Sequence, residues 1–197
     1  MKLKSTLIVI LLLVACTISY AQNEKANTSG YGYDFNMSFV YNFVNFSENM
    51  GLNKKNGDTF LVSADYYINP KVFVGGGLGW CSTYLTSEYE YYNSTTWMHT
   101  FQIPVYIGLN INHRLLSIDT GPYFEIPFAA TTTLRHLGDE ISKTKLKDMN
   151  GVNDIALGWA INFRIARFIK FSIGTTLTDS VFGDDIGMTT ISIGVGL

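Results

Sequence analysis

Charged residues are scarce in this sequence. Asp, Glu, Lys and Arg make up 15% of the 197 residues, and the formal net charge is -2. A disordered chain needs more charge and fewer aromatic rings, so the composition argues against long disordered segments. A nucleic-acid-binding protein usually has a basic excess, so we expect no nucleic-acid partner. After residue 21 no run of about 18 apolar residues occurs, so the sequence predicts no transmembrane helix.

Cysteine is scarce as well, with Cys16 and Cys81 as the two examples. Because Cys16 lies in a segment that we expect to be removed, one cysteine remains and no internal disulfide framework is expected. His113 and His136 lack the closely spaced Cys, His or carboxylate ligands of a metal centre. We therefore predict no metal site and no cofactor.

Apolar and aromatic side chains are abundant. Hydrophobic residues make up 47% of the chain, which also holds 13 Phe, 12 Tyr and 18 Gly. The mean hydropathy of +0.13 is high for a soluble protein. A chain that is this apolar, yet has no membrane-spanning helix, points to strands as the elements that meet lipid.

The N-terminus has the pattern of a secretory signal peptide. Basic residues in Met1–Lys4 precede an apolar core from Leu7 to Ala15 and a small-x-small site at Ser19–Ala21. We expect a signal peptide over 1–21 with cleavage after Ala21, a periplasmic tail over 22–30 and a barrel domain over 31–197. Alternatively, Leu13–Cys16 resembles a lipoprotein box, in which Cys16 would be lipidated.

Alternation with a period of two runs through the rest of the chain. From Tyr31 to Phe43 every odd position is large and apolar or aromatic, and most even positions are small or polar. This period places the two kinds of side chain on opposite faces of a strand. The pattern recurs in eight segments: 31–43, 60–68, 72–84, 97–111, 116–128, 154–165, 169–177 and 190–197.

The connections between these segments alternate in length. Short turns lie near 69–70, 112–114 and 166–167, and long polar connections near 47–58, 86–95, 133–153 and 179–188. This layout predicts an all-β fold, an eight-stranded antiparallel up-and-down transmembrane β-barrel of the bacterial outer membrane. Large apolar residues would face lipid, and small or polar residues would fill the interior. A soluble lipocalin-like or sandwich protein is the alternative.

Three short motifs resemble a known family. The strand Phe101–Gly108 with its Ile-Pro pair, the Gly-Pro-Tyr segment at Gly121–Tyr123 and the closing Ile191–Gly196 are similar to the Bacteroidota outer-membrane β-barrel domain family, which includes porin-family and PorT-like small barrels. The resemblance implies the same fold and location, with a C-terminal strand read by the barrel-assembly machinery. Gly108 stands where that family often has Lys, and Leu197 where outer-membrane barrels usually end in an aromatic residue.

Charged residues also fall on the predicted inward face. They are Asp65, Asp119, Glu125, Arg164 and Lys170. Buried charges are tolerated when they are paired and hydrogen-bonded, so we predict an internal polar network. The alternative is a path for a solute or a proton, as in a narrow porin-like channel.

A histidine lies on the predicted lipid face. If residue 82 lies opposite 99, Ser82 is next to His99, and such a pair could deacylate lipopolysaccharide. A nucleophile of this kind also needs a third group to orient the base, and Glu88 is the nearest acid in sequence. An interfacial histidine among aromatic residues is the alternative, and we predict that the protein is not an enzyme.

The long connections carry the remaining candidate surface. Tyr84, Tyr89, Tyr91 and Tyr92 cluster above the third and fourth segments, and exposed tyrosine is typical of binding surfaces. The bases of 133–153 face either water or lipopolysaccharide phosphates. We predict a structural, adhesive or surface-binding role toward an extracellular protein or glycan, in contact with outer-membrane lipid and lipopolysaccharide.

Overall fold

The computed structural model describes residues 32–46, 54–88, 91–112, 115–149, 152–166, 168–182 and 186–196. The predicted signal peptide with Cys16, and also Tyr31, Tyr89 and Leu197, lie outside the described residues. In the described part, no helix is long and apolar enough to cross a membrane.

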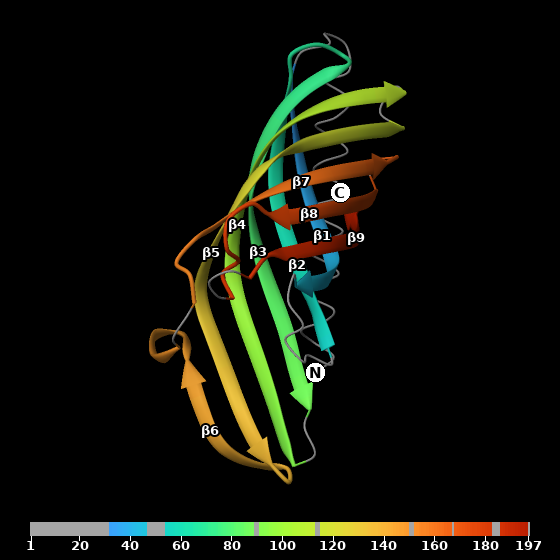
Figure 1. Cartoon of the computed structure of the whole chain (residues 1–197). Helices are drawn as coiled ribbons and strands as arrows, with labels where there is room; N and C mark the ends of the chain where they lie inside the picture. Colours follow the sequence, from blue (N-terminus) through green and yellow to red (C-terminus); the bar gives the residue numbers. More distant parts are fainter. Residues whose placement is uncertain are drawn as a thin grey trace, which may run out of the picture.

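In the described residues, nine strands form one antiparallel sheet. They are β1 (Gly32–Phe46), β2 (Lys54–Tyr67), β3 (Val72–Glu88), β4 (Tyr92–Asn112), β5 (Leu116–His136), β6 (Asp139–Lys145), β7 (Ala156–Ile165), β8 (Ile169–Thr176) and β9 (Met188–Gly196), with a short 3-10 turn η1 (Leu146–Asp148). The order is β4-β3-β2-β1-β9-β8-β7-β5, and β5 pairs back with β4. This closed ring of eight strands confirms the predicted barrel (Figure 1).

The two faces of the ring differ as the alternation predicts. Ile193 on the outer face is 45% exposed, whereas its neighbour Ser192 on the inner face is 7% exposed. The same contrast holds for Phe163 and Asn162 in β7. Large apolar side chains therefore cover the outside of the ring, and polar side chains line much of its interior.

Short turns close one end of the ring. Between β2 and β3, the Asn69 side-chain oxygen accepts hydrogen bonds from the backbone N–H groups of Lys71 and Val72, at 2.8 and 2.9 Å. This Asx-type turn fixes the Asn69-Pro70 corner predicted from sequence. Ala166, with φ 49°, makes the corresponding corner between β7 and β8.

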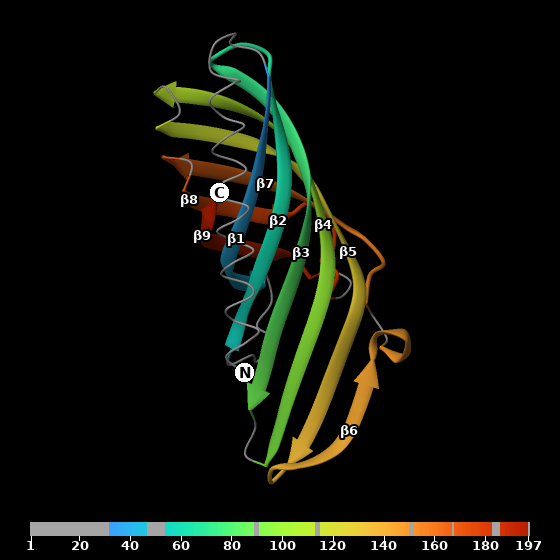
Figure 2. The ribbon, with the colours of Figure 1, turned by 180° about the vertical axis from the view of Figure 1, so that it is seen from behind.

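Strands β3, β4 and β5 continue well beyond the ring at the other end, and β6 pairs with the outer part of β5 (Figures 1 and 2). We call β6 and the outer parts of β3, β4 and β5 the extension. Sequence analysis expected loops over 86–95 and 133–153, and this expectation was wrong for 86–88, 92–95, 133–136 and 139–145, which are strands. Apolar alternation ends here, but the run Thr131–Thr133 keeps the β-branched character that favours strands.

Aromatic rings occupy part of the interior that sequence analysis assigned to small and polar residues. Each ring lies over a glycine of another strand, where a Cβ atom would overlap it. The pairs are Phe73 over Gly108, Tyr106 over Gly75 and Tyr123 over Gly158. Glycine is needed at these positions for close approach, which lets large rings fill a narrow ring of strands.

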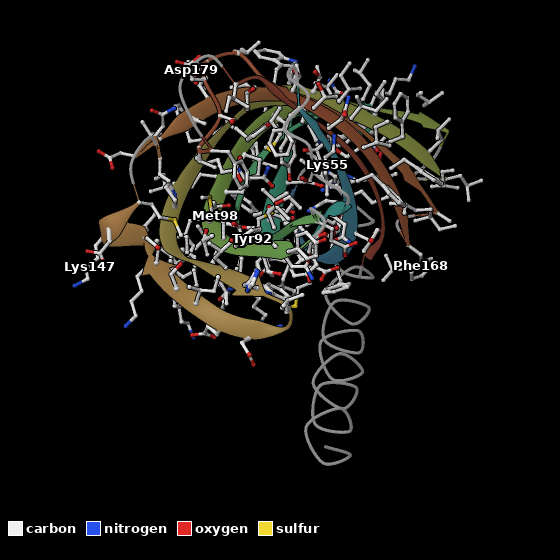
Figure 3. All side chains as sticks on the ribbon, turned by 60° about the horizontal axis from the view of Figure 1, so that its bottom comes forward. Lys55, Tyr92, Met98, Lys147, Phe168 and Asp179 are labelled. Carbon is white, nitrogen blue, oxygen red and sulfur yellow. The ribbon has the colours of Figure 1, made fainter. Side chains whose placement is uncertain are left out.

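Apolar side chains fill the outer mouth of the ring, and we call this group the plug. It combines two clusters that both contact Phe182. Their buried members are Val44, Phe46, Leu85 and Met188 in one, and Met98, Ala130, Ala156 and Val181 in the other. The connection over 179–188 was expected to be an exposed polar loop, yet Ser180 and Val181 are fully buried. Figure 3 looks onto this end and shows Met98 among the side chains that fill it.

Candidate functional site

Three of the five predicted interior charges meet in one cluster, which we call the ion belt. Arg164 Nη1 lies 2.6 Å from Asp65 Oδ2, and Arg164 Nη2 lies 2.9 Å from Asp119 Oδ2. Each carboxylate also accepts a hydrogen bond from a neighbouring side chain. Tyr106 donates to Asp65 at 2.7 Å, and Asn162 donates to Asp119 at 2.6 Å.

The belt joins three strands of the ring. Asp65 on β2 and Arg164 on β7 are on non-adjacent strands, so this ion pair crosses the lumen, whereas Asp119 on β5 lies on the strand next to Arg164. The guanidinium also lies 5.3 Å from the ring centre of Phe73 and 5.2 Å from that of Tyr106. Charge pairing, hydrogen bonds and aromatic faces together offset the cost of burying these charges.

The other two predicted charges line a separate cavity of about 70 Å³. Thr100 donates to Glu125 Oε1 at 2.8 Å, whereas Glu125 Oε2 is buried and has no hydrogen-bond partner among the described residues. Lys170 lines the same cavity and makes no ion pair within the described part of the chain. The predicted five-residue network is thus divided into the paired ion belt and two residues, Glu125 and Lys170, that make no ion pair with any described residue.

The cavity lies between the plug and the ion belt. Val44 and Met188 belong to the plug and also line the cavity, and Asn162 lines the cavity and also binds Asp119. The lining is rich in hydroxyl and amide groups, and the volume is sufficient for several water molecules. The lumen is therefore occupied at three successive levels.

On the outer face, β3 and β4 pair with Ser82 opposite His99, the register that sequence analysis used. The Ser82 Oγ lies 2.7 Å from His99 Nδ1, and Trp80 Nε1 donates to the same nitrogen at 3.4 Å. A bulge between His99 and Thr100 leaves Phe128 unpaired, and its ring stacks on His99. The pair has the contact that nucleophile activation requires.

The third group of a catalytic triad is not brought to this pair. His99 Nε2 has no hydrogen-bond partner among the described residues. Glu88, the acid nearest in sequence, pairs with Asn93 farther along the extension. Within the described ranges, no three His, Cys, Asp or Glu side chains are grouped as a metal centre would require.

The four predicted tyrosines do not form one surface. Tyr84 packs against Trp97 with ring centres 4.5 Å apart, close to the ring of strands. Tyr92 is the first residue of β4 and Tyr91 directly precedes it, at the far end of the extension. Tyr89 is outside the described residues.

We call Tyr91, Tyr92, His136 and Leu137 the aromatic tip. Tyr92 packs on His136 with ring centres 4.8 Å apart, and the Leu137 N–H donates to the Tyr91 carbonyl at 3.1 Å. Leu137 is 74% exposed, Tyr91 59% and Tyr92 46%. Leu137 has φ 50°, which is unfavourable for a side chain with a Cβ. Sequence analysis missed His136 and Leu137 because it treated their segment as a loop.

The family model of the outer membrane protein beta-barrel domain matches residues 8–197. The chain belongs to this family. It is therefore a bacterial outer-membrane protein whose ring crosses the membrane, and the soluble alternative is excluded. The narrower resemblance to Bacteroidota barrels stays a prediction. No curated protein matches the sequence.

Solved structures of other small barrels are similar in fold. The attachment invasion locus protein Ail of Yersinia pestis, in complex with the heparin analogue sucrose octasulfate, has a TM-score of 0.48 and 14% identity, covering 84% of this chain and 97% of its own. Neisserial surface protein A has a TM-score of 0.44 and 12% identity, covering 84% of this chain and 98% of its own. The outer membrane enzyme PagL has a TM-score of 0.33 and 11% identity, covering 82% of this chain and 98% of its own. Because these TM-scores lie below 0.5, none carries an argument about function.

Proposed function

We propose that this protein is a non-catalytic surface-binding barrel that holds an extracellular protein or glycan at the aromatic tip. The observation that carries this proposal is the exposure of Tyr91, Tyr92 and Leu137 at the end of paired strands. Aromatic side chains supply large contact area at low cost in conformational entropy, and they are enriched at binding hot spots.

The build of the extension supports this role. The backbone hydrogen bond between Leu137 and Tyr91 joins the two hairpin ends, so the tip is one unit. Paired strands hold it away from the ring, where a partner in solution can reach it. Leu137 and Gly138, with φ 50° and 97°, form the two-residue turn between β5 and β6, which presents the Leu137 side chain to solvent.

The test uses whole bacteria that lack other adhesins and display the full chain. Attachment is measured on surfaces coated with a matrix protein, a sulfated polysaccharide or a neutral polysaccharide. We expect wild-type cells to attach to at least one coating. We expect Tyr91→Ser with Tyr92→Ser to lower attachment about 10-fold or more, as for loss of a hot spot. The matched control is Tyr33→Ser, on the outer face of β1. Equal attachment by wild-type and tip-variant cells on every coating would overturn the proposal.

A second function is favoured by the 2.7 Å contact between Ser82 and His99. In this reading, the Ser82 hydroxyl attacks an acyl ester of a membrane lipid while His99 Nδ1 takes its proton. The acyl group passes to Ser82, the lipid alcohol leaves with the proton from His99, and water then releases the fatty acid. The unpartnered Nε2 of His99 argues for the non-enzymatic reading, because the base has nothing to orient it.

Mass spectrometry of lipid A separates these two functions. If the pair is catalytic, cells with His99→Ala regain the acyl chain that wild-type cells lack, and Ser82→Ala gives the same result. Trp80→Phe is the control, because it keeps the ring and removes the hydrogen bond to His99. An identical lipid profile in all strains removes the enzymatic function.

The filled lumen disfavours the channel that the sequence left open. The plug, the small cavity and the ion belt lie in series along it. We expect planar-bilayer recordings of the purified barrel to show no discrete conductance steps.

A further inference from the structure

Acidic and basic residues occupy opposite ends of β6. Asp139 and Glu140 begin the strand next to the aromatic tip, whereas Lys143 and Lys145 lie toward the ring, because β6 runs back along β5. Within β6 the acids therefore lie at the far end, where Arg135 is opposite Glu140, and the lysines lie at the near end.

The strand register shows how far toward the membrane the lysines reach. Lys145 lies opposite Thr131, Thr131 opposite Trp97, and Trp97 opposite Tyr84. The next row outward contains Thr86, Thr95, Thr133 and Lys143. None of these paired positions in the two rows of β3, β4, β5 and β6 is acidic.

The lysines lie on the lipid-facing side of the sheet. Residues directly opposite in an antiparallel pair project to the same face. Trp97 is on the outer face, where it is 48% exposed. Lys143 and Lys145 therefore share that outer face, together with Thr131 and Thr133.

The outer face changes character along these rows. Toward the ring it is apolar, with Trp80 opposite Phe101. Tyr84 and Trp97 come next, and such residues mark the level where hydrocarbon meets headgroups. The threonine and lysine row begins directly beyond them. This order places the lysine ammonium groups at the depth of lipid headgroups.

We propose that Lys143 and Lys145 bind the phosphates of the phosphorylated glycolipid, lipopolysaccharide, in the outer leaflet around the barrel. Alternate residues of a strand lie about 7 Å apart on one face, so the two ammonium groups can contact one or two phosphates. Lysine binds phosphate as a point charge, and the Thr131 and Thr133 hydroxyls supply further donors. The proposal is independent of the aromatic tip.

The test compares two lipids on the purified, detergent-folded full chain. Native mass spectrometry measures binding of diphosphorylated lipid A and of the same lipid A after its phosphates are removed. We expect wild-type protein to bind the phosphorylated lipid about 10-fold or more tightly. Equal affinity for the two lipids overturns the proposal, and this arm needs no substitution.

Variants then locate the site. We expect Lys143→Gln with Lys145→Gln to remove the preference for the phosphorylated lipid, and the double Arg variant to keep it. Asp139→Asn with Glu140→Gln is the matched control in the same strand and should keep the preference, as should Lys71→Gln at the opposite end of the barrel. A preference that survives in the Gln variant, or is lost equally in both controls, overturns the assignment.

Discussion

The ion belt and the cavity above it are two neighbouring parts of one lumen that treat buried charge differently. In the belt, Arg164 is paired with Asp65 and Asp119, and both carboxylates accept further hydrogen bonds. In the cavity, Glu125 is as deeply buried but has one oxygen without a protein partner, and Lys170 has no ion pair among the described residues.

The difference predicts opposite responses to the loss of one charged group in the belt and in the cavity. A buried pair that loses one member is strongly destabilised, because an uncompensated charge is left behind. A buried charge with an unmet hydrogen bond already carries that cost, so its removal should be neutral or favourable. Substitutions in the two parts should therefore change the free energy of unfolding with opposite signs.

The largest effect is expected for Arg164→Met. It leaves Asp65 and Asp119 without a cation and should lower the free energy of unfolding by about 3–5 kcal/mol. Urea unfolding in lipid vesicles, followed by the gel mobility of the folded barrel, measures this loss. Arg164→Lys keeps the charge but cannot contact both carboxylates in the same way. Its free energy of unfolding should lie between those of the wild type and Arg164→Met. A loss below about 1 kcal/mol in the Met variant would show that the belt is not the stabilising element.

Asp119→Asn should have an intermediate effect. It weakens the hydrogen bonds from Arg164 and Asn162 but leaves Arg164 paired with Asp65. We expect a loss of about 1–3 kcal/mol in the same unfolding assay, as for loss of a charge-assisted hydrogen bond. A loss as large as that of Arg164→Met would mean that Asp65 alone cannot hold the guanidinium.

Glu125→Gln should change stability in the opposite direction. The amide oxygen can still accept the Thr100 hydrogen bond, while a buried ionisable group with an unmet hydrogen bond is replaced by a neutral one. We expect a gain of about 1 kcal/mol. A clear loss of stability would show that Oε2 depends on a partner in the cavity, and the contrast with the ion belt would then fail.

The smallest effect is expected for Lys170→Met. Lys170 lies directly opposite Arg164 in the β7–β8 pair, so its removal relieves a like-charge contact and exchanges a polar group for an apolar one. We expect a change within about 1 kcal/mol, and effects that add in the double variant with Glu125→Gln. Non-additivity above about 1 kcal/mol would reveal coupling between Glu125 and Lys170 across the cavity.

Sequence alternation predicted the strands and their faces, because the membrane imposes a strict two-sided pattern on each strand, whereas the Ser82–His99 register entered as a condition that the structure meets. The alternation failed where that constraint ends. Outside the membrane both faces are polar, so the hairpin from β5 to β6 was read as a loop. The sequence also gives no sign that the segment around Ser180 folds into the mouth, since Val181 alone is a weak apolar signal.

The alternation along each strand also identified which charged side chains point inward, but not which of them form ion pairs. Asp119 meets Arg164 from the neighbouring strand, but Asp65 meets it from across the lumen, which depends on the tilt and stagger of all the strands. Phe73, Tyr106 and Tyr123 were missed for a related reason. A large aromatic side chain can point inward when the residue that it packs over on another strand is glycine. That glycine can be identified only when the register of the strand pairs is known.

The ion belt has a consequence for how the barrel is assembled. Asp65 and Arg164 are 99 residues apart, and they lie on strands that do not touch in the sheet. Their contact therefore cannot exist while the sheet is still open. It forms when the sheet curls, whereas the Asp119–Arg164 pair joins the adjacent strands β5 and β7 and needs no closed ring. Closure therefore brings the second carboxylate to the guanidinium, and opening the barrel would separate Asp65 from Arg164 again.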